Sequence, residues 1–252
     1  MTTQEALFNY CLRLADNHLI LGHRLSELCS KGPVLEEDIA CTNISLDLIG
    51  QANALLQYAA SIENNGRNED DLAFLRHERH FYNSLLSEQP NRDFAFTMVK
   101  QFLIDAFNYY LFDELKKSKD LTISALTTKG HKEITYHLRH SSTWIDRLGL
   151  GTDESNLRTQ NAINELWRFT DDMFVMDEVD KMLITDGIAT DLNIIKTKWQ
   201  NTVNGAFEKA NLKIPEKVWM QYGSKQGKHT EHLGFLLAEM QHLHRAYPGV
   251  KW

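Results

Sequence analysis

Four acidic residues on four long predicted helices are the side chains in this sequence best placed to hold metal ions together. They are Asp47, Glu78, Asp105 and Glu133. Each falls in an apolar stripe with the three- and four-residue steps of a helix, and such a stripe faces the interior. A buried carboxylate is costly without a partner, so four of them predict cation binding. The arrangement typical of helical bundles is a carboxylate-bridged di-iron centre.

The histidines that would complete such a centre are absent. A helical di-iron site uses Glu-x-x-His twice, but Glu78 is followed at the third position by Phe81, and Glu133 by Tyr136. Phenylalanine cannot coordinate iron, and imidazole is the donor that suits it. We therefore predict no bound metal and a vestigial site made of Asp47, Glu78, Phe81, Asp105, Glu133 and Tyr136.

Other side chains are expected to replace the metal or to have unrelated roles. Lys129 and His137 lie one helical turn on either side of Glu133, so we expect ion pairs and hydrogen bonds there. The remaining metal-like spacings are interpreted as packing or chance: His77 with His80, His137 with His140, His229 with His232, and Glu239 with His242. No residue is predicted to be catalytic or to bind a cofactor.

The elements that would position the four acids are five long helices with short loops. The predicted ranges are 3–29, 36–64, 70–89, 94–117 and 121 to 149 or 151, followed by shorter helices at 154–173, 177–185, 191–210, 215–222 and 229–246. This pattern predicts an all-α protein built on an antiparallel bundle. We expect a single domain over 1–252, with the long-helix bundle in 1–150 and additional packed helices in 151–252.

Composition limits the classes of function. The net charge of −7 argues against a nucleic-acid-binding protein. We predict no membrane span, because no apolar run reaches the length needed to cross a bilayer, and no secretory signal. The three cysteines lie in helical patterns, which indicates reduced thiols in a cytoplasmic protein.

Five long stretches resemble the family of C subunits of bacterial phenylacetyl-CoA epoxidase complexes. They are LRLADNHLILGHRLSELC (12–29), CTNISLDLIGQANALLQYAA (41–60), DLAFLRHERHFYNSLLSEQPNRDFA (71–95), EITYHLRHSSTWIDRLGLGTDES (133–155) and GKHTEHLGFLLAEMQHLHRAYPGVKW (227–252). The resemblance covers nearly the whole chain, from Leu12 to Trp252.

The resemblance implies a ferritin-like helical bundle with additional C-terminal helices, and a non-catalytic structural role in phenylacetate catabolism. It implies that a sister A subunit holds the di-iron centre and pairs with this chain. A small B subunit and a reductase that draws electrons from NADPH would complete the complex, which converts phenylacetyl-CoA to its ring-1,2-epoxide with O₂. The chain would then hold no cofactor of its own.

Alternatives stay open at the level of sequence. The chain could be an independent carboxylate-rich di-iron or di-manganese oxidase, or a ferritin-like storage protein or scaffold. It could also form a homodimer when isolated. The apolar residues Leu12, Leu19, Ile20 and Leu28 could face a partner or be covered within the chain. A basic loop with Lys225, Lys228 and His229 could contact coenzyme A or a partner, or lie in solvent ahead of a helix capped by Thr230.

Overall fold

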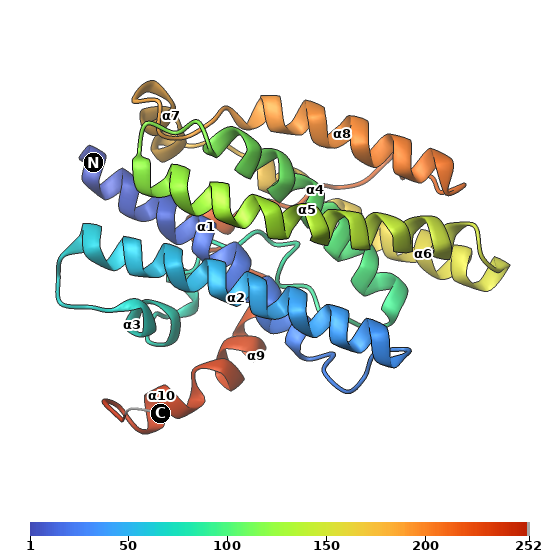
Figure 1. Cartoon of the computed structure of the whole chain (residues 1–252), viewed down its shortest axis with the longest axis horizontal. Helices are drawn as coiled ribbons and strands as arrows, with labels where there is room; N and C mark the ends of the chain where they lie inside the picture. Colours follow the sequence, from blue (N-terminus) through green and yellow to red (C-terminus); the bar gives the residue numbers. More distant parts are fainter. Residues whose placement is uncertain (251–252) are drawn as a thin grey trace. The chain divides into compact units, whose positions relative to one another are not determined.

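A computed structural model of the chain describes residues 1–250 (Figure 1). Within that range 71% of the residues are helical and none forms a strand, which confirms the all-α class and is consistent with a ferritin-like bundle. Lys251 and Trp252, which end the last resembling stretch, lie outside the described residues. The chain forms two compact units, one from Met1–Pro90 with Gly223–Trp252 and the other from Asn91–Tyr222. The single domain stays a prediction.

The first unit is built on a pair of long antiparallel helices. Its helices are α1 (Thr3–Ser26), α2 (Leu35–Glu63), α3 (Glu69–Phe74), α9 (Glu231–Met240) and α10 (His242–Ala246). A capping box between Thr2 and Glu5 starts α1, and Asn64, in the left-handed conformation, ends α2. Figure 1 shows α2 lying along α1 over most of its length.

At Gly22, helix α1 approaches α2 closely. A Cβ atom there would lie 2.9 Å from Cγ1 of Ile49 and 3.3 Å from the carbonyl oxygen of Ser45. The hydroxyl of Ser45 also donates a hydrogen bond of 2.8 Å to the carbonyl oxygen of Gly22. Any larger side chain at this position would therefore push the two helices apart.

The second unit packs four helices around a common core and adds one short helix. They are α4 (Phe94–Leu115), α5 (Leu121–Gly149), α6 (Asp153–Leu166) and α8 (Leu192–Lys209), with the short helix α7 (Glu178–Thr185) before α8. Trp199 of α8 is 2% exposed, packs near Trp167 and Phe174, and donates its indole N–H to the carbonyl of Leu103 at 2.8 Å. This bond satisfies the polar atom of the largest buried side chain.

The predicted third helix, 70–89, is wrong beyond its first turns. Only Glu69–Phe74 is α-helical, a 3₁₀ turn covers Glu78–His80, and the chain then runs as turns and irregular backbone to Pro90. Two backbone N–H groups of this segment donate to side chains of α1 and not to carbonyls of a helical turn. The N–H of Tyr82 donates to Asp16 at 2.9 Å, and that of Ser84 donates to Asn17 at 2.8 Å. These long-range bonds override the local helical pattern.

Smaller differences affect four other predicted helices. The predicted helix 3–29 ends at Ser26, the helix 154–173 changes to 3₁₀ turns after Leu166, and the helix 229–246 breaks at Gln241. Residues 215–222 are irregular, because Gln221 gives its backbone N–H to the carbonyl of Arg168 instead of to a helical partner. The predicted ranges 94–117, 121 to 149 or 151, 177–185 and 191–210 agree with α4, α5, α7 and α8 within two residues.

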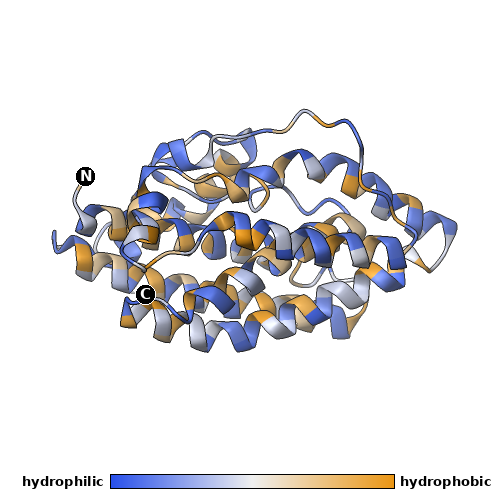
Figure 2. Cartoon of the chain, turned by 90° about the horizontal axis from the view of Figure 1, so that it is seen from above, coloured by the Kyte–Doolittle hydropathy of each residue, from blue (hydrophilic) through white to orange (hydrophobic). Residues whose placement is uncertain are grey.

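Figure 2 shows that hydrophilic and hydrophobic residues alternate along most helices. This pattern is typical of helices with one face in a core and one face in solvent. No helix within residues 1–250 combines the length and apolar character that spanning a bilayer requires.

Candidate functional site

Asp105 lies in the core of the second unit and has two hydrogen-bond donors. It sits on α4 and is 1% exposed. The side-chain amide of Gln101, one turn earlier, donates to Oδ1 at 2.7 Å, and the hydroxyl of Ser141 on α5 donates to Oδ2 at 2.8 Å. The prediction that Asp105 faces the interior is confirmed. Each carboxylate oxygen is engaged by a neighbouring side chain, as expected for a buried acid without a cation.

Burial is the main influence on the acidity of Asp105. It raises the pKa of this carboxyl from 3.8 to about 6, against the opposing charge of His137 and the hydrogen bonds from Ser141 and Gln101. His137 is itself fully buried on α5.

Glu133 and Tyr136 of α5 lie nearer the surface than predicted. Glu133 is half-buried, Tyr136 is 40% exposed, and the proposed cation Lys129 is exposed. The ring of Tyr136 lies against the imidazole of His140, with 6.2 Å between centroids, and under the guanidinium of Arg139. Tyr136 is therefore part of a surface cluster of side chains, and its ring does not take the inward position of a metal ligand.

Glu78 and Phe81 belong to the segment where the third helix was predicted, and their positions differ from the prediction. Glu78 is exposed at the start of the 3₁₀ turn, so the expectation that it faces the core is wrong. Phe81 is fully buried instead, with the guanidinium of Arg76 4.1 Å from its ring centre. Asp47, the remaining acid of the first unit, is half-buried on α2.

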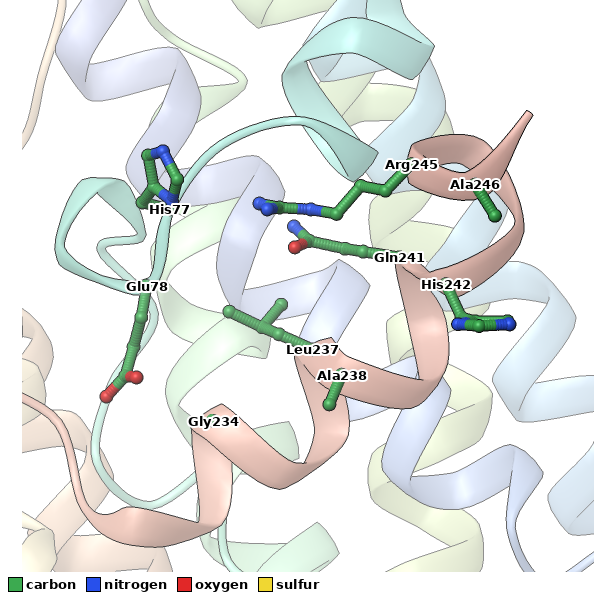
Figure 3. A pocket seen from close by; sticks show the side chains of 9 residues that line it. All are labelled: His77, Glu78, Gly234, Leu237, Ala238, Gln241, His242, Arg245 and Ala246. Carbon is green, nitrogen blue, oxygen red and sulfur yellow. The ribbon is translucent and has the colours of Figure 1, made fainter. Parts of the chain in front are cut away.

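The side chain of Glu78 forms one wall of a pocket in the first unit. The pocket has a volume of about 490 Å³ and lies between the 77–78 segment and helices α9 and α10 (Figure 3). Arg245 and Gln241 extend across it toward the 77–78 segment, and both donate to the carbonyl oxygen of Arg76 at 3.0 Å. Figure 3 shows His242 pointing away from Glu78, so these groups do not converge on one point.

These geometries do not fit a di-iron centre. Phe81 offers no donor atom, Glu78 is exposed, and Asp105 is already bonded on both oxygens. Among residues 1–250 no group of three or more His, Cys, Asp or Glu side chains is placed to hold a metal ion. Phe81, Glu78 and Asp105 therefore do not supply the ligands of a di-iron centre in this arrangement.

Glu88 is a fully buried acid of the first unit that was not predicted from the sequence. Its Oε1 accepts from the backbone N–H and the hydroxyl of Thr230, at 2.6 and 2.8 Å, and its Oε2 accepts from the side-chain amide of Asn83 at 2.9 Å. The imidazole of His229 lies 2.8 Å from the same Oε2. The only signal in the sequence was the position of this acid, two residues after Leu86 and two before Pro90.

His229 was expected in a basic loop open to a ligand, a partner or solvent, but it is not exposed. Its side chain is completely buried, with Nδ1 facing Glu88 and Nε2 facing the carbonyl oxygen of Phe81 at 2.9 Å. Both neighbours offer acceptor oxygens, an arrangement that favours a ring protonated on both nitrogens. Thr230 does occupy the N-cap position of α9, but its hydroxyl bonds to Glu88 and not to the helix.

The loop before His229 is anchored by close backbone packing. Gly227 adopts a positive φ of 66°, and a Cβ there would lie 2.1 Å from the carbonyl oxygen of Arg79. A 3₁₀ turn, Ser224–Gln226, precedes it, and Ser224 is buried. Of the two lysines of this loop, Lys225 is half-buried and Lys228 is exposed.

Of the four apolar residues that could face a partner or be covered within the chain, three are buried. Leu12 and Leu19 are each 4% exposed and Ile20 is fully buried, while Leu28 beyond the end of α1 is half-buried. Leu12, Leu19 and Ile20 are therefore covered by the chain itself. A partner surface must use residues other than Leu12, Leu19 and Ile20.

Comparison with known proteins gives two concordant results. The model of the family described as phenylacetic acid catabolic protein matches residues 1–252. The chain is also 48% identical over 243 residues to the C subunit of 1,2-phenylacetyl-CoA epoxidase from Escherichia coli (strain K12), an alignment that covers 96% of this chain and 98% of that protein. With a match over its full length, the chain belongs to the phenylacetic acid catabolic protein family.

Proposed function

We propose that this chain is a non-catalytic structural subunit of a multicomponent phenylacetyl-CoA 1,2-epoxidase that acts in phenylacetate catabolism in the cytoplasm. The observation that carries the proposal is the 48% identity to the C subunit of such an epoxidase over nearly the full length of both chains. Because the match is not confined to one motif, it supports the same place in the same kind of complex.

The proposed partner is a separate di-iron subunit that performs the oxygen chemistry and pairs with this chain. A small B subunit and an NADPH-dependent reductase would complete the assembly. When bound in the partner, the iron supplies the activation of O₂. The residues of this chain do not take part in that step: Phe81 has no donor atom, and Asp105 is bonded to Gln101 and Ser141. Their role is to stabilise a core that has no metal.

The test compares this chain alone with the chain co-purified with the di-iron subunit of the same organism. We expect no stoichiometric iron and no O₂ consumption for the chain alone. The pair should bind about two irons per partner subunit and form the epoxide when reductase and NADPH are supplied. Stoichiometric iron and O₂ consumption by the isolated chain would instead establish the alternative, an independent carboxylate-rich oxidase.

A further inference from the structure

The outer face of α2 carries an apolar stripe that the chain leaves exposed. Leu35 is 70% exposed, Ile39 50% and Leu46 62%. Steps of three and four residues place Thr42 and Gly50 on the same side of the helix. We refer to these five residues, Leu35, Ile39, Thr42, Leu46 and Gly50, as the α2 stripe. It covers about 22 Å at the helical rise of roughly 1.5 Å per residue.

The opposite face of α2 is apolar as well. Ile44, Leu48, Leu55 and Ala59 are each at most 2% exposed, and α2 packs against α1. A helix with apolar side chains on two opposite faces is typical of an element that packs against a neighbour on each of those faces. Within residues 1–250 nothing covers the α2 stripe, since its three large side chains remain at least half exposed.

The spacing and size of the stripe residues suit a second helix. Alternating steps of three and four residues form the seam of packed helices, in which side chains of one helix enter the gaps of the other. At the C-terminal end of the stripe, a Cβ built on Gly50 would have no atom within 4 Å, so another backbone can approach closely there. The shape therefore favours an elongated helical occupant over a small molecule.

The charges of α2 indicate the chemistry of that occupant. The helix carries Glu36, Glu37, Asp38, Asp47 and Glu63 and contains no lysine or arginine. Glu36 is exposed directly beside Leu35, at the start of the stripe. A second copy of the same surface would add only further acids, whereas a helix with basic residues beside its apolar face would be attracted.

We propose that the α2 stripe is the docking surface for an amphipathic helix of a partner subunit, one whose apolar face is flanked by Lys or Arg. This inference rests on the proposed function, because the partner is another member of the same complex. Ile39 and Leu46 supply the apolar contact, Gly50 permits close approach, and Glu36 sets the orientation of a basic edge.

The test uses paired arginine substitutions and measures binding to the purified di-iron subunit of the same organism by calorimetry. The Ile39→Arg/Leu46→Arg variant should weaken binding at least 30-fold, since it removes apolar contact and places positive charge against a basic edge. The matched control is Leu157→Arg/Ile194→Arg, on α6 and α8, where the residues are 60% and 49% exposed. It should bind like the wild type. Circular dichroism checks that both variants are folded.

A second variant tests the charge. Glu36→Gln should weaken binding 3- to 10-fold at low salt, and the difference from the wild type should shrink as the salt concentration rises. Unchanged affinity of the folded Ile39→Arg/Leu46→Arg variant overturns the proposal. So does a wild-type chain that is dimeric alone and becomes monomeric with those substitutions, because a second copy would then occupy the stripe. If the wild type itself neither binds the di-iron subunit nor supports turnover, the proposed function fails instead.

Discussion

The carboxylate of Glu88 and the imidazole of His229 form a buried ion pair 2.8 Å long, between side chains with no exposed surface. The pair joins the irregular segment before Pro90 to the residue just before the N-cap of α9. Arg24 of α1 reinforces the junction by donating to the backbone carbonyls of Glu88, at 2.9 Å, and His232, at 2.6 Å. The C-terminal helices of the first unit are thus held to α1 by charged groups as well as by apolar packing.

Substitution of His229 by leucine should destabilise the first unit by about 3 kcal/mol. Removing one partner of a buried ion pair leaves the other charge without compensation. Urea denaturation followed by circular dichroism at pH 6 measures the loss. His242→Leu, an exposed histidine of α10, is the control and should change the free energy of unfolding by less than about 0.5 kcal/mol. Equal stabilities of the two variants would contradict the assigned ion pair.

The stabilisation from His229 should depend on pH with a defined sign. Burial lowers the pKa of His229, but the hydrogen bond and charge of Glu88 outweigh it, so the pKa is raised above 6.5 in the folded protein. The contribution is therefore complete below pH 6.5 and is lost as the pH rises through the raised folded value. Unfolding free energies of the wild type and His229→Leu, measured between pH 6 and pH 9, should converge at the alkaline end.

The helices that depend on local signals were predictable from the sequence, and the segment that depends on distant partners was not. Asp93, Asp120 and Asp191 each cap the helix that follows, and α4, α5 and α8 begin where predicted within two residues. Residues 75–90 carry a helical pattern of apolar positions. Their backbone is nevertheless bonded to Asp16 and Asn17 of α1, a choice that no local pattern encodes.

The same distinction explains the candidate site. Asp105 was located correctly because α4 is a long regular helix and the periodicity of its apolar residues fixes the inward face. Glu78 was misplaced because its inward position required the third helix to continue. Glu88 was missed because its burial depends on Asn83, His229 and Thr230, two of which lie more than 140 residues away in the sequence.

Asp105→Asn should stabilise the protein above pH 6. The raised pKa means that the folded protein holds this proton more tightly than the unfolded chain, so stability falls as the pH rises from 3.8 to about 6 and stays lower above it. Asparagine avoids that cost, which is about 3 kcal/mol at roughly 1.4 kcal/mol per pKa unit. Its oxygen can accept from Gln101, while its amide donates to the hydroxyl of Ser141. Thermal or urea denaturation at pH 5 and pH 8 should show a larger gain at pH 8.

The control for Asp105→Asn is Asp113→Asn, because the pKa of Asp113 is lowered in the folded protein whereas that of Asp105 is raised. A hydrogen bond from Lys116 lowers the pKa of the Asp113 carboxyl. This group therefore contributes stability above its ordinary pKa, and its removal should not stabilise the protein at pH 8. A destabilised Asp105→Asn at both pH values would show that the ionised carboxylate is needed in the core. Epoxidase turnover of the reconstituted complex should be retained in either variant.

Gly22→Val should destabilise the α1–α2 pair by about 2 to 3 kcal/mol. The added side chain would collide with Ile49 and with the carbonyl of Ser45, and the overpacked helices must separate. The control is Gly205→Ala in α8, where a Cβ has no atom within 4 Å and alanine should add up to about 1 kcal/mol through helix propensity. Urea denaturation of both variants under the same conditions should show a lower free energy of unfolding for Gly22→Val and a higher one for Gly205→Ala.

Restoring both histidines of the di-iron pattern should not restore iron binding. The variant Phe81→His/Tyr136→His supplies two imidazoles, but Glu78 lies exposed on a 3₁₀ turn, the Tyr136 position is 40% exposed, and Asp105 is bonded to Gln101 and Ser141. The Phe81 change should also destabilise the first unit by about 2 to 4 kcal/mol, since it removes a fully buried ring beneath Arg76. Tyr136→His alone, at a surface position, serves as the folding control.

Metal analysis after reconstitution with ferrous iron decides the outcome of that substitution. We expect well below one iron per chain for Phe81→His/Tyr136→His, the same as for the wild type and Tyr136→His. Two irons per chain would mean that the 75–90 segment refolds into the predicted helix and turns Glu78 inward. Without such refolding, the bonds from Asp16 and Asn17 hold the backbone of this segment away from the helical path that a Glu-x-x-His motif requires.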